Sequence, residues 1–227
     1  MSWTDFSAGT MWSAAALAIW AALSASRNVA IPGRRSFILM QSAIALWSAT
    51  AGVELLSSSM TSYLWISRVQ YIGIVSLPVF WFRFAGTYAH RLNPRNRSLD
   101  ALWLVPFVTV MAAFTNDSHH LLWTDIVMPG PGDVLPTYVR GPIFWLNWIH
   151  AYVLIAIGTV WLALTLRHYS ARYRIQLWLL ILGVLAPWVG NLLYILGLVP
   201  LPGLDMTPLA FSVSGACFVA SVFAARR

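Results

Sequence analysis

Long apolar runs, separated by short polar or arginine-rich stretches, dominate the chain. Most of the runs have about the 20 residues that a helix needs to cross the hydrocarbon core of a bilayer. The pattern predicts seven spans, at about residues 8–26, 36–56, 63–89, 99–114, 141–166, 175–196 and 205–225. Because backbone polar groups in lipid must be paired within a helix or a closed barrel, we expect an all-α, polytopic membrane protein. Residues 1–227 would form one seven-helix transmembrane bundle.

Composition supports a membrane protein and removes one class of seven-helix protein. The chain is 59% hydrophobic and 9% charged, whereas soluble domains are about 25% charged. All fourteen basic residues are arginine. Retinal is attached through a lysine amine, so a conventional rhodopsin is excluded. The single Cys217 lies in the last apolar run and has no second cysteine with which to form an internal disulfide.

The arginines gather in alternate loops. Eleven of them follow the first, third and fifth spans or end the chain: Arg27, Arg34, Arg35, Arg91, Arg95, Arg97, Arg167, Arg172, Arg174, Arg226 and Arg227. Loops on the other side carry most of the acids, and Arg140 is the clear exception. By the positive-inside rule the N-terminus is outside and the C-terminus is cytoplasmic, in the plasma membrane. Because these charges lie in short loops, we do not expect a nucleic-acid partner.

Charged residues within spans need a partner or a purpose, since each costs about 2.5 to 3.5 kcal/mol at the centre of the bilayer on insertion scales. Glu54 lies near the outer end of the second span and Arg68 near the outer start of the third. We expect these two to pair, either as a structural clip or as part of a ligand site. Arg83 lies in the inner half of the third span, from where its side chain can reach the cytoplasmic headgroups.

Polar side chains recur at helical spacing in the fifth and sixth spans. Asn147 and His150 are three residues apart, as are Asn191 and Tyr194. Such residues face away from lipid, so we expect them to point into the bundle toward its outer side. They would either line a ligand pocket or form hydrogen bonds between helices.

The start of the last span adds two more candidates, Asp205 and Thr207. One reading is local: Asp205 caps the last helix and Pro208 occupies its first turn. The other reading places the carboxylate at the rim of the cavity, beside the polar residues of the fifth and sixth spans.

No pattern typical of catalysis is present. The chain has no phosphate loop, nucleophile elbow or CxxC, and its inner loops are short, so we expect no enzymatic activity within these residues. The adjacent His119 and His120 would point about 100° apart on a helix and make a poor chelating pair. We predict no metal and no cofactor, although haem at His150 stays open.

Four stretches in order along the chain resemble the N-terminal seven-transmembrane region of bacterial and archaeal histidine kinases. They are Thr115-Asn116 with His119 or His120 and Trp123, the run Gly141-Pro142-Ile143-Phe144-Trp145, the segment from Pro187 to Gly197, and Gly203 to Pro208 with Phe211. The resemblance implies a sensory module in a prokaryotic inner membrane that signals to a cytoplasmic output domain or a partner kinase. Kinase or cyclase activity would reside in that output domain.

The resulting hypothesis is a receptor module. It would bind a small or lipophilic ligand in the outer half of the bundle, at Glu54, Arg68, Asn147, His150, Asn191, Tyr194, Asp205 and Thr207, and relay a conformational change inward. Expected partners are the ligand, membrane lipid, the output domain and a second copy of the chain. The alternatives are a small transporter, which would show repeats in two halves, and a membrane subunit that holds haem or a carotenoid.

Overall fold

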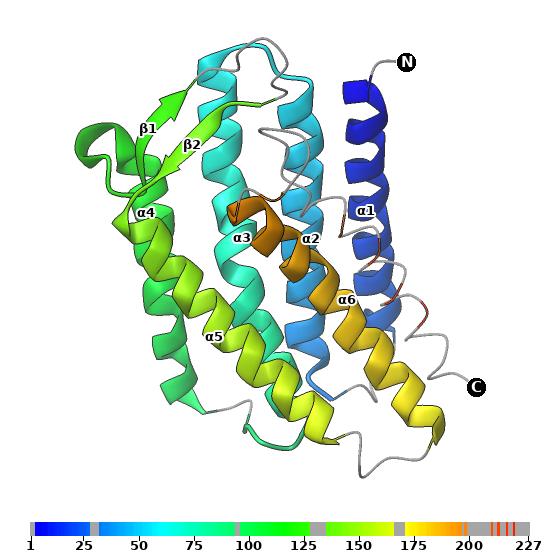
Figure 1. The fold of residues 1–227 in the computed structure, drawn as a ribbon. Coiled ribbons are helices and arrows are strands. Elements are labelled where there is room, and N and C mark those ends of the chain that lie inside the picture. Colours follow the sequence, from blue (N-terminus) through cyan, green and yellow to red (C-terminus); the bar gives the residue numbers. More distant parts are fainter. Residues whose placement is uncertain are drawn as a thin grey trace.

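The computed structural model describes residues 3–27, 32–93, 96–127, 135–165 and 171–196, together with positions 198, 210, 213, 217 and 220. Within this part of the chain, six long helices follow one another and one two-stranded sheet interrupts them (Figure 1). The elements are α1 (Trp3–Ser26), α2 (Arg34–Leu55), α3 (Met60–Tyr88), the 3₁₀ helix η1 (Arg97–Trp103), α4 (Leu104–His119), β1 (Trp123–Val127), β2 (Thr137–Arg140), α5 (Pro142–Thr165) and α6 (Ala171–Ile195).

These helices coincide with six of the predicted spans. Among the described residues, five helical segments are long and apolar enough to cross a membrane: α1, α2, α3, η1 with α4, and α5. Helix α6 contains a shorter apolar stretch, Leu177–Leu193. The chain is therefore a polytopic helical bundle. The predicted seventh span, 205–225, lies outside the described residues except for four helical positions, at 210, 213, 217 and 220.

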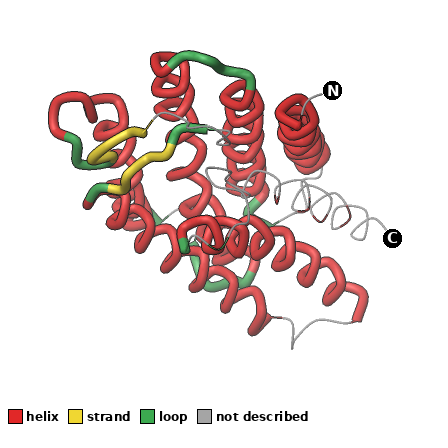
Figure 2. The backbone as a smooth tube through the Cα atoms, turned by 45° about the horizontal axis from the view of Figure 1, so that its top comes forward, coloured by secondary structure: helices red, strands yellow, loops and turns green. Residues whose placement is uncertain are grey.

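The region between the fourth and fifth spans differs from the all-α prediction. Helix α4 continues to His119, five residues beyond the expected end, and strands β1 and β2 then pair antiparallel, with Ile126 opposite Tyr138. The predicted spans left residues 115–140 between two helices, with no strand expected there. The strands are rich in β-branched and aromatic residues, which favour extended backbone. The hairpin, drawn in yellow in Figure 2, lies beside the start of α3 and the end of α4.

Small residues bring the first three helices close together. The face of α1 toward α2 consists largely of fully buried alanines, such as Ala14, Ala18 and Ala21. Side chains this small allow two helix backbones to approach closely. In lipid, where the hydrophobic effect does not drive helices together, such close packing stabilises their association. Between α2 and α3, a Cβ on Gly73 would lie 2.7 Å from the carbonyl oxygen of Ala43. Gly73 therefore sets the distance between these two helices.

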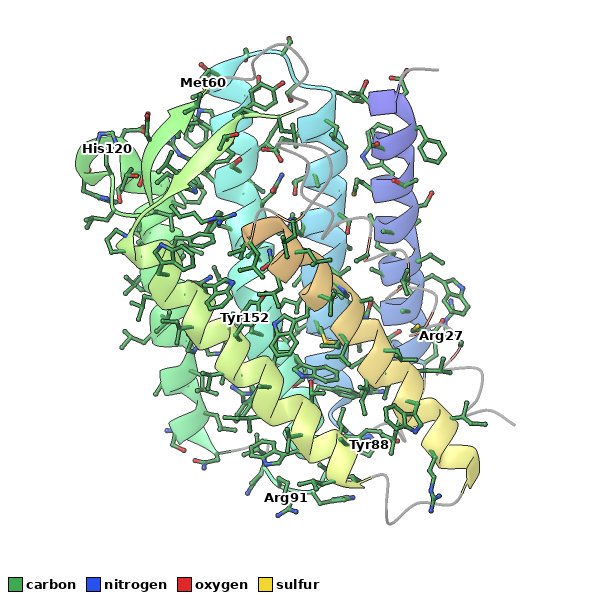
Figure 3. The ribbon with its side chains drawn as sticks, in the orientation of Figure 1. Arg27, Met60, Tyr88, Arg91, His120 and Tyr152 are labelled. Carbon is green, nitrogen blue, oxygen red and sulfur yellow. The ribbon has the colours of Figure 1, made fainter. Side chains whose placement is uncertain are left out.

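The bundle has two distinct ends, which orient everything below. The hairpin end carries β1, β2, the ends of α2 and α4, and the starts of α3 and α5. Met60 and His120 mark it in Figure 3, and Tyr88 and Arg91 mark the opposite end, which we call the arginine end. Helix α3 packs against α2, α4 and α5, and α6 packs against α5.

Candidate functional site

Four helices line an aromatic cavity of about 110 Å³, here called the inner cavity. Helices α2, α3, α5 and α6 each contribute to its wall. A stack of rings forms one side: the centroids of Trp148 and Tyr152 are 4.1 Å apart, and those of Tyr152 and Trp188 are 4.8 Å apart. The hydroxyl of Tyr152, which is labelled in Figure 3, donates to Asn191 Oδ1 at 3.1 Å. The stack and this hydrogen bond join α5 to α6.

A second, more polar cavity of about 140 Å³ adjoins the first toward the hairpin end, and we call it the outer cavity. The two cavities share five lining residues: Trp47, Tyr71, Ile74, Phe144 and Asn191. The polar part of the outer wall comes from α2, α3 and the second strand of the hairpin, with Glu54, Ser67, Gln70, Tyr138 and Arg140. One end of the combined space is therefore polar and the other is aromatic and apolar.

Glu54 is the buried acid of this site. Its side chain accepts a hydrogen bond from Ser67 Oγ at 3.0 Å and one from Gln70 Nε2 at 2.6 Å. Ser67 Oγ also lies 2.6 Å from the hydroxyl of Tyr138 on β2. A carboxylate in a low-dielectric interior requires such donors. Glu54 therefore ties the end of α2 to α3 and, through Ser67, to the hairpin.

The predicted pair between Glu54 and Arg68 does not form, because Arg68 pairs with Asp117 on α4. Arg68 Nη2 lies 2.6 Å from Asp117 Oδ1, and Arg68 Nε donates to the carbonyl of Ala113 at 3.1 Å. Adjacent helix positions point about 100° apart, so α3 turns Ser67 toward Glu54 and Arg68 toward α4. The extra length of α4 brings Asp117 to this level. Arg68 lines neither cavity.

The remaining predicted site residues divide into three groups. Asn147 is buried and lines the inner cavity, and Asn191 lines both cavities. His150 is half-buried on α5 and lines neither of them. The side chain of Tyr194, and both Asp205 and Thr207, lie outside the described residues.

Arg140 is a site residue that sequence reasoning did not select. Its Nη1 donates to the carbonyl of Ile195, at the end of α6, at 3.0 Å, and its guanidinium lies 5.3 Å from the ring centre of Phe144. A cation at a helix C-terminus satisfies a carbonyl that has no intrahelical donor. The sequence did hint at Arg140, because it is the clear exception among the loops on the outer side, which otherwise carry acids.

Asn116 explains why Thr115-Asn116 and Trp123 occur together. Its Oδ1 accepts from the backbone N–H groups of Leu122 and Trp123, both at 3.0 Å, and its Nδ2 donates to the carbonyl of Trp123 at 2.9 Å. These bonds hold the start of β1 against α4. Trp123 is thereby placed edge-on to Tyr71, with ring centroids 5.4 Å apart, in the wall of the outer cavity.

Gly141 and Pro142 join the hairpin to α5. The N–H of Gly141 donates to the carbonyl of Leu122 at 2.8 Å, and a Cβ on Gly141 would overlap the carbonyl of Leu121. Only glycine fits this close approach. Pro142 begins α5, where its missing N–H removes no helical bond.

Two buried donors at the inner cavity have no acceptor within the described part of the chain. They are the indole N–H groups of Trp148 and Trp188, and both rings line the cavity. Buried polar groups are normally paired, so an unpaired donor calls for an explanation. A ligand with an acceptor atom is one such explanation.

Comparison with protein families gives a match that covers nearly the whole chain. The model of the N-terminal 7TM region of histidine kinase matches residues 9–226. Searches of curated proteins and of solved structures give no match. On the strength of the family match, this chain belongs to the family of N-terminal seven-transmembrane regions of histidine kinases.

Proposed function

We propose that the chain is a membrane receptor module that binds a small amphipathic or lipophilic ligand in the two adjoining cavities. Binding would bias the packing of the bundle and so signal to a cytoplasmic output domain such as a histidine kinase. The observation that carries the proposal is the shared wall between an aromatic cavity and a polar cavity. Family membership supports a sensory role and leaves the ligand open.

The lining suggests what the ligand looks like. The aromatic walls of the inner cavity suit an apolar body, while Glu54 and Arg140 in the outer cavity suit a polar group that can both donate and accept. An acceptor oxygen on the apolar body would serve the indole N–H of Trp148 or Trp188 after a small rotation of either ring. Binding sites of this type are mostly apolar with a few placed polar groups.

Two prolines in the cavity wall support a relay along the helices. Pro78 of α3 and Pro187 of α6 both line the inner cavity. Proline has no N–H to donate to the carbonyl four residues earlier, which in α3 is that of Ile74, another residue of the wall. Helices bend readily at such positions. A ligand in this cavity would therefore press on the points where α3 and α6 are easiest to bend.

The test of the proposal is to fill the inner cavity from within. Ala151 lines it, whereas Ala163, twelve residues further along the same helix, is exposed. Native mass spectrometry of the protein in mild detergent, with identification of released small molecules, should show a stoichiometric adduct. In Ala151→Trp the abundance of the adduct should fall at least tenfold, because the indole occupies the ligand space. In Ala163→Trp the abundance should be unchanged.

Thermal unfolding of each variant shows whether loss of the adduct reflects loss of the fold, since a large side chain inserted into a packed interior can strain it. If Ala151→Trp is unstable, Ala151→Leu provides a milder filling of the same space. An adduct that survives in a stable Ala151 variant, or is lost equally in both tryptophan variants, would place the ligand outside the inner cavity and contradict the proposal.

A further inference from the structure

At the arginine end lies a separate cleft of about 680 Å³. It is formed by the start of α2, the last turns of α3 and the 3₁₀ helix η1. Its lining residues are Gly33, Arg34, Arg35, Ser36, Leu39, Phe80, Arg83, Thr87, Asp100 and Trp103. None of them lines the inner or the outer cavity.

The cleft is positively charged at its rim. Its lining contains three arginines, Arg34, Arg35 and Arg83, and one acid, Asp100, whose carboxylate lies 3.2 Å from Arg83. Arg34 donates to the carbonyl of Ser26 at 3.3 Å. Within the described part of the chain, the side chain of Arg35 makes no hydrogen bond or ion pair and is exposed. The charge of this rim is therefore only partly compensated.

The start of α2 adds to the attraction for anions. Gly33 precedes the helix and provides no side chain to cap it. The first N–H groups of a helix have no intrahelical acceptor, and the helix dipole favours negative charge at this end. The hydroxyl of Ser36 lies in the same wall.

Below the charged rim the cleft is apolar. Leu39 lies one turn further along α2 than Arg35, and Phe80 lies about one turn deeper in α3 than Arg83. Phe80 packs edge-on against Trp103, with ring centroids 5.0 Å apart. Charge at the rim and apolar wall beneath it match a phospholipid, whose phosphate lies at the membrane surface and whose chains run along the helices. A water-soluble phosphate compound would gain nothing from the apolar wall.

We propose that this cleft binds one anionic phospholipid through its phosphate group. Guanidinium groups bind phosphate with paired, charge-assisted hydrogen bonds, and anionic lipids attract basic groups at the cytoplasmic surface. Arg35 would be the main ligand, with Arg34 and Arg83 on either side. The sequence predicts that Arg83 reaches the headgroups. In this cleft it would do so while Asp100 holds its guanidinium in place.

The lipid would bridge three elements that meet at this end. The start of α2, the end of α3 and η1 would share one phosphate, which would fix their spacing at the side where the signal leaves the membrane. The site is independent of the ligand in the cavities near the hairpin, so either proposal can fail without the other.

The test is lipid titration of the full chain in mild detergent, followed by native mass spectrometry. Phosphatidylglycerol should form one saturable adduct, and phosphatidylcholine with the same acyl chains should bind at least tenfold more weakly. Arg35→Gln should weaken the binding of phosphatidylglycerol about fivefold, which is the effect of about one basic residue near an anionic surface. The double variant Arg34→Gln/Arg35→Gln should weaken this binding more than tenfold. Arg27→Gln with Arg91→Gln is the matched control, because both arginines lie outside the cleft.

Three outcomes decide the proposal. Selective loss in the Arg34 and Arg35 variants, with the control pair unchanged, supports it. Equal loss in both double variants would show attraction by total charge and overturn it. Inorganic phosphate or glycerol phosphate that displaces phosphatidylglycerol at millimolar concentration would keep the phosphate site but overturn the lipid as its occupant. Because Arg35 is exposed, we expect the Arg35→Gln variant to fold like the unsubstituted protein.

Discussion

At the scale of single residues, Asn116 stands out because one side chain holds the turn between α4 and β1. It satisfies two backbone N–H groups and one carbonyl, and it is buried. A buried backbone group left without a partner costs about 1 to 3 kcal/mol. We therefore expect Asn116 to hold the hairpin, with Trp123 and Tyr138, at the outer cavity.

Replacing Asn116 with alanine should lower the thermal unfolding temperature in detergent substantially, because three backbone partners are lost together. A loss of about 2 to 4 kcal/mol is expected, since water reaches some of these groups once the turn loosens. Ser118→Ala, two residues later, is the control: its hydroxyl donates only to the carbonyl of Thr115 and is exposed. Similar unfolding temperatures for both variants would show that Asn116 does not hold the turn.

At the scale of elements, the pairing of α3 with α4 depends on a buried arginine and an exposed acid. The side chain of Arg68 is 6% exposed and that of Asp117 is 71% exposed. Asp117 can be solvated alone, whereas Arg68 cannot, so the two residues are not equivalent. Removing the acid leaves a buried charge with fewer partners, and removing the arginine leaves an acid in water.

Asp117→Ala should therefore destabilise the protein by about 1 to 3 kcal/mol, while Arg68→Met, which keeps the apolar stem, should cost less. Thermal unfolding of the two variants measures this order. Because Arg68 lines neither cavity, Arg68→Met should also retain the ligand adduct. The reverse order of stability would contradict this account of the ion pair, and loss of the adduct in Arg68→Met would return Arg68 to the ligand site.

At the scale of the whole molecule, the two ends differ in charge and in structure. The hairpin end carries the outer cavity with its buried acid, and the arginine end carries the basic cleft. If the arginine end is cytoplasmic, ligand from outside the cell or from the lipid meets the polar cavity, and the anionic surface of the inner leaflet meets the cleft. The same orientation in the membrane therefore serves both proposed sites.

Cysteine labelling in intact cells tests this orientation. In a Cys217→Ser background, Ser118→Cys at the hairpin end and Ser98→Cys at the arginine end each place one thiol at an exposed position. A membrane-impermeant maleimide should label the first variant in intact cells and the second only after the membrane is opened. Labelling in the opposite pattern would invert the topology.

The sequence alone determined the properties that depend on local pattern. Hydrophobic run length sets where helices form in lipid, so six predicted spans match helices within the described residues, and ordered motifs were enough to indicate the family that the comparison confirmed. Asn147, Asn191 and Glu54 were predicted as site residues for a related reason: a polar group within a span has to face the interior, and all three line a cavity.

Only the tertiary structure decided which side chains meet. The partner of Arg68 depends on how far α4 extends and on the rotation of α3, and neither can be read from hydropathy. The two strands of the hairpin pair although nine residues, 128–136, separate them in the chain, so their pairing depends on more than the local pattern. The cavities and the basic cleft likewise exist because helices distant in sequence pack side by side, and the distance between them depends on residues such as Gly73.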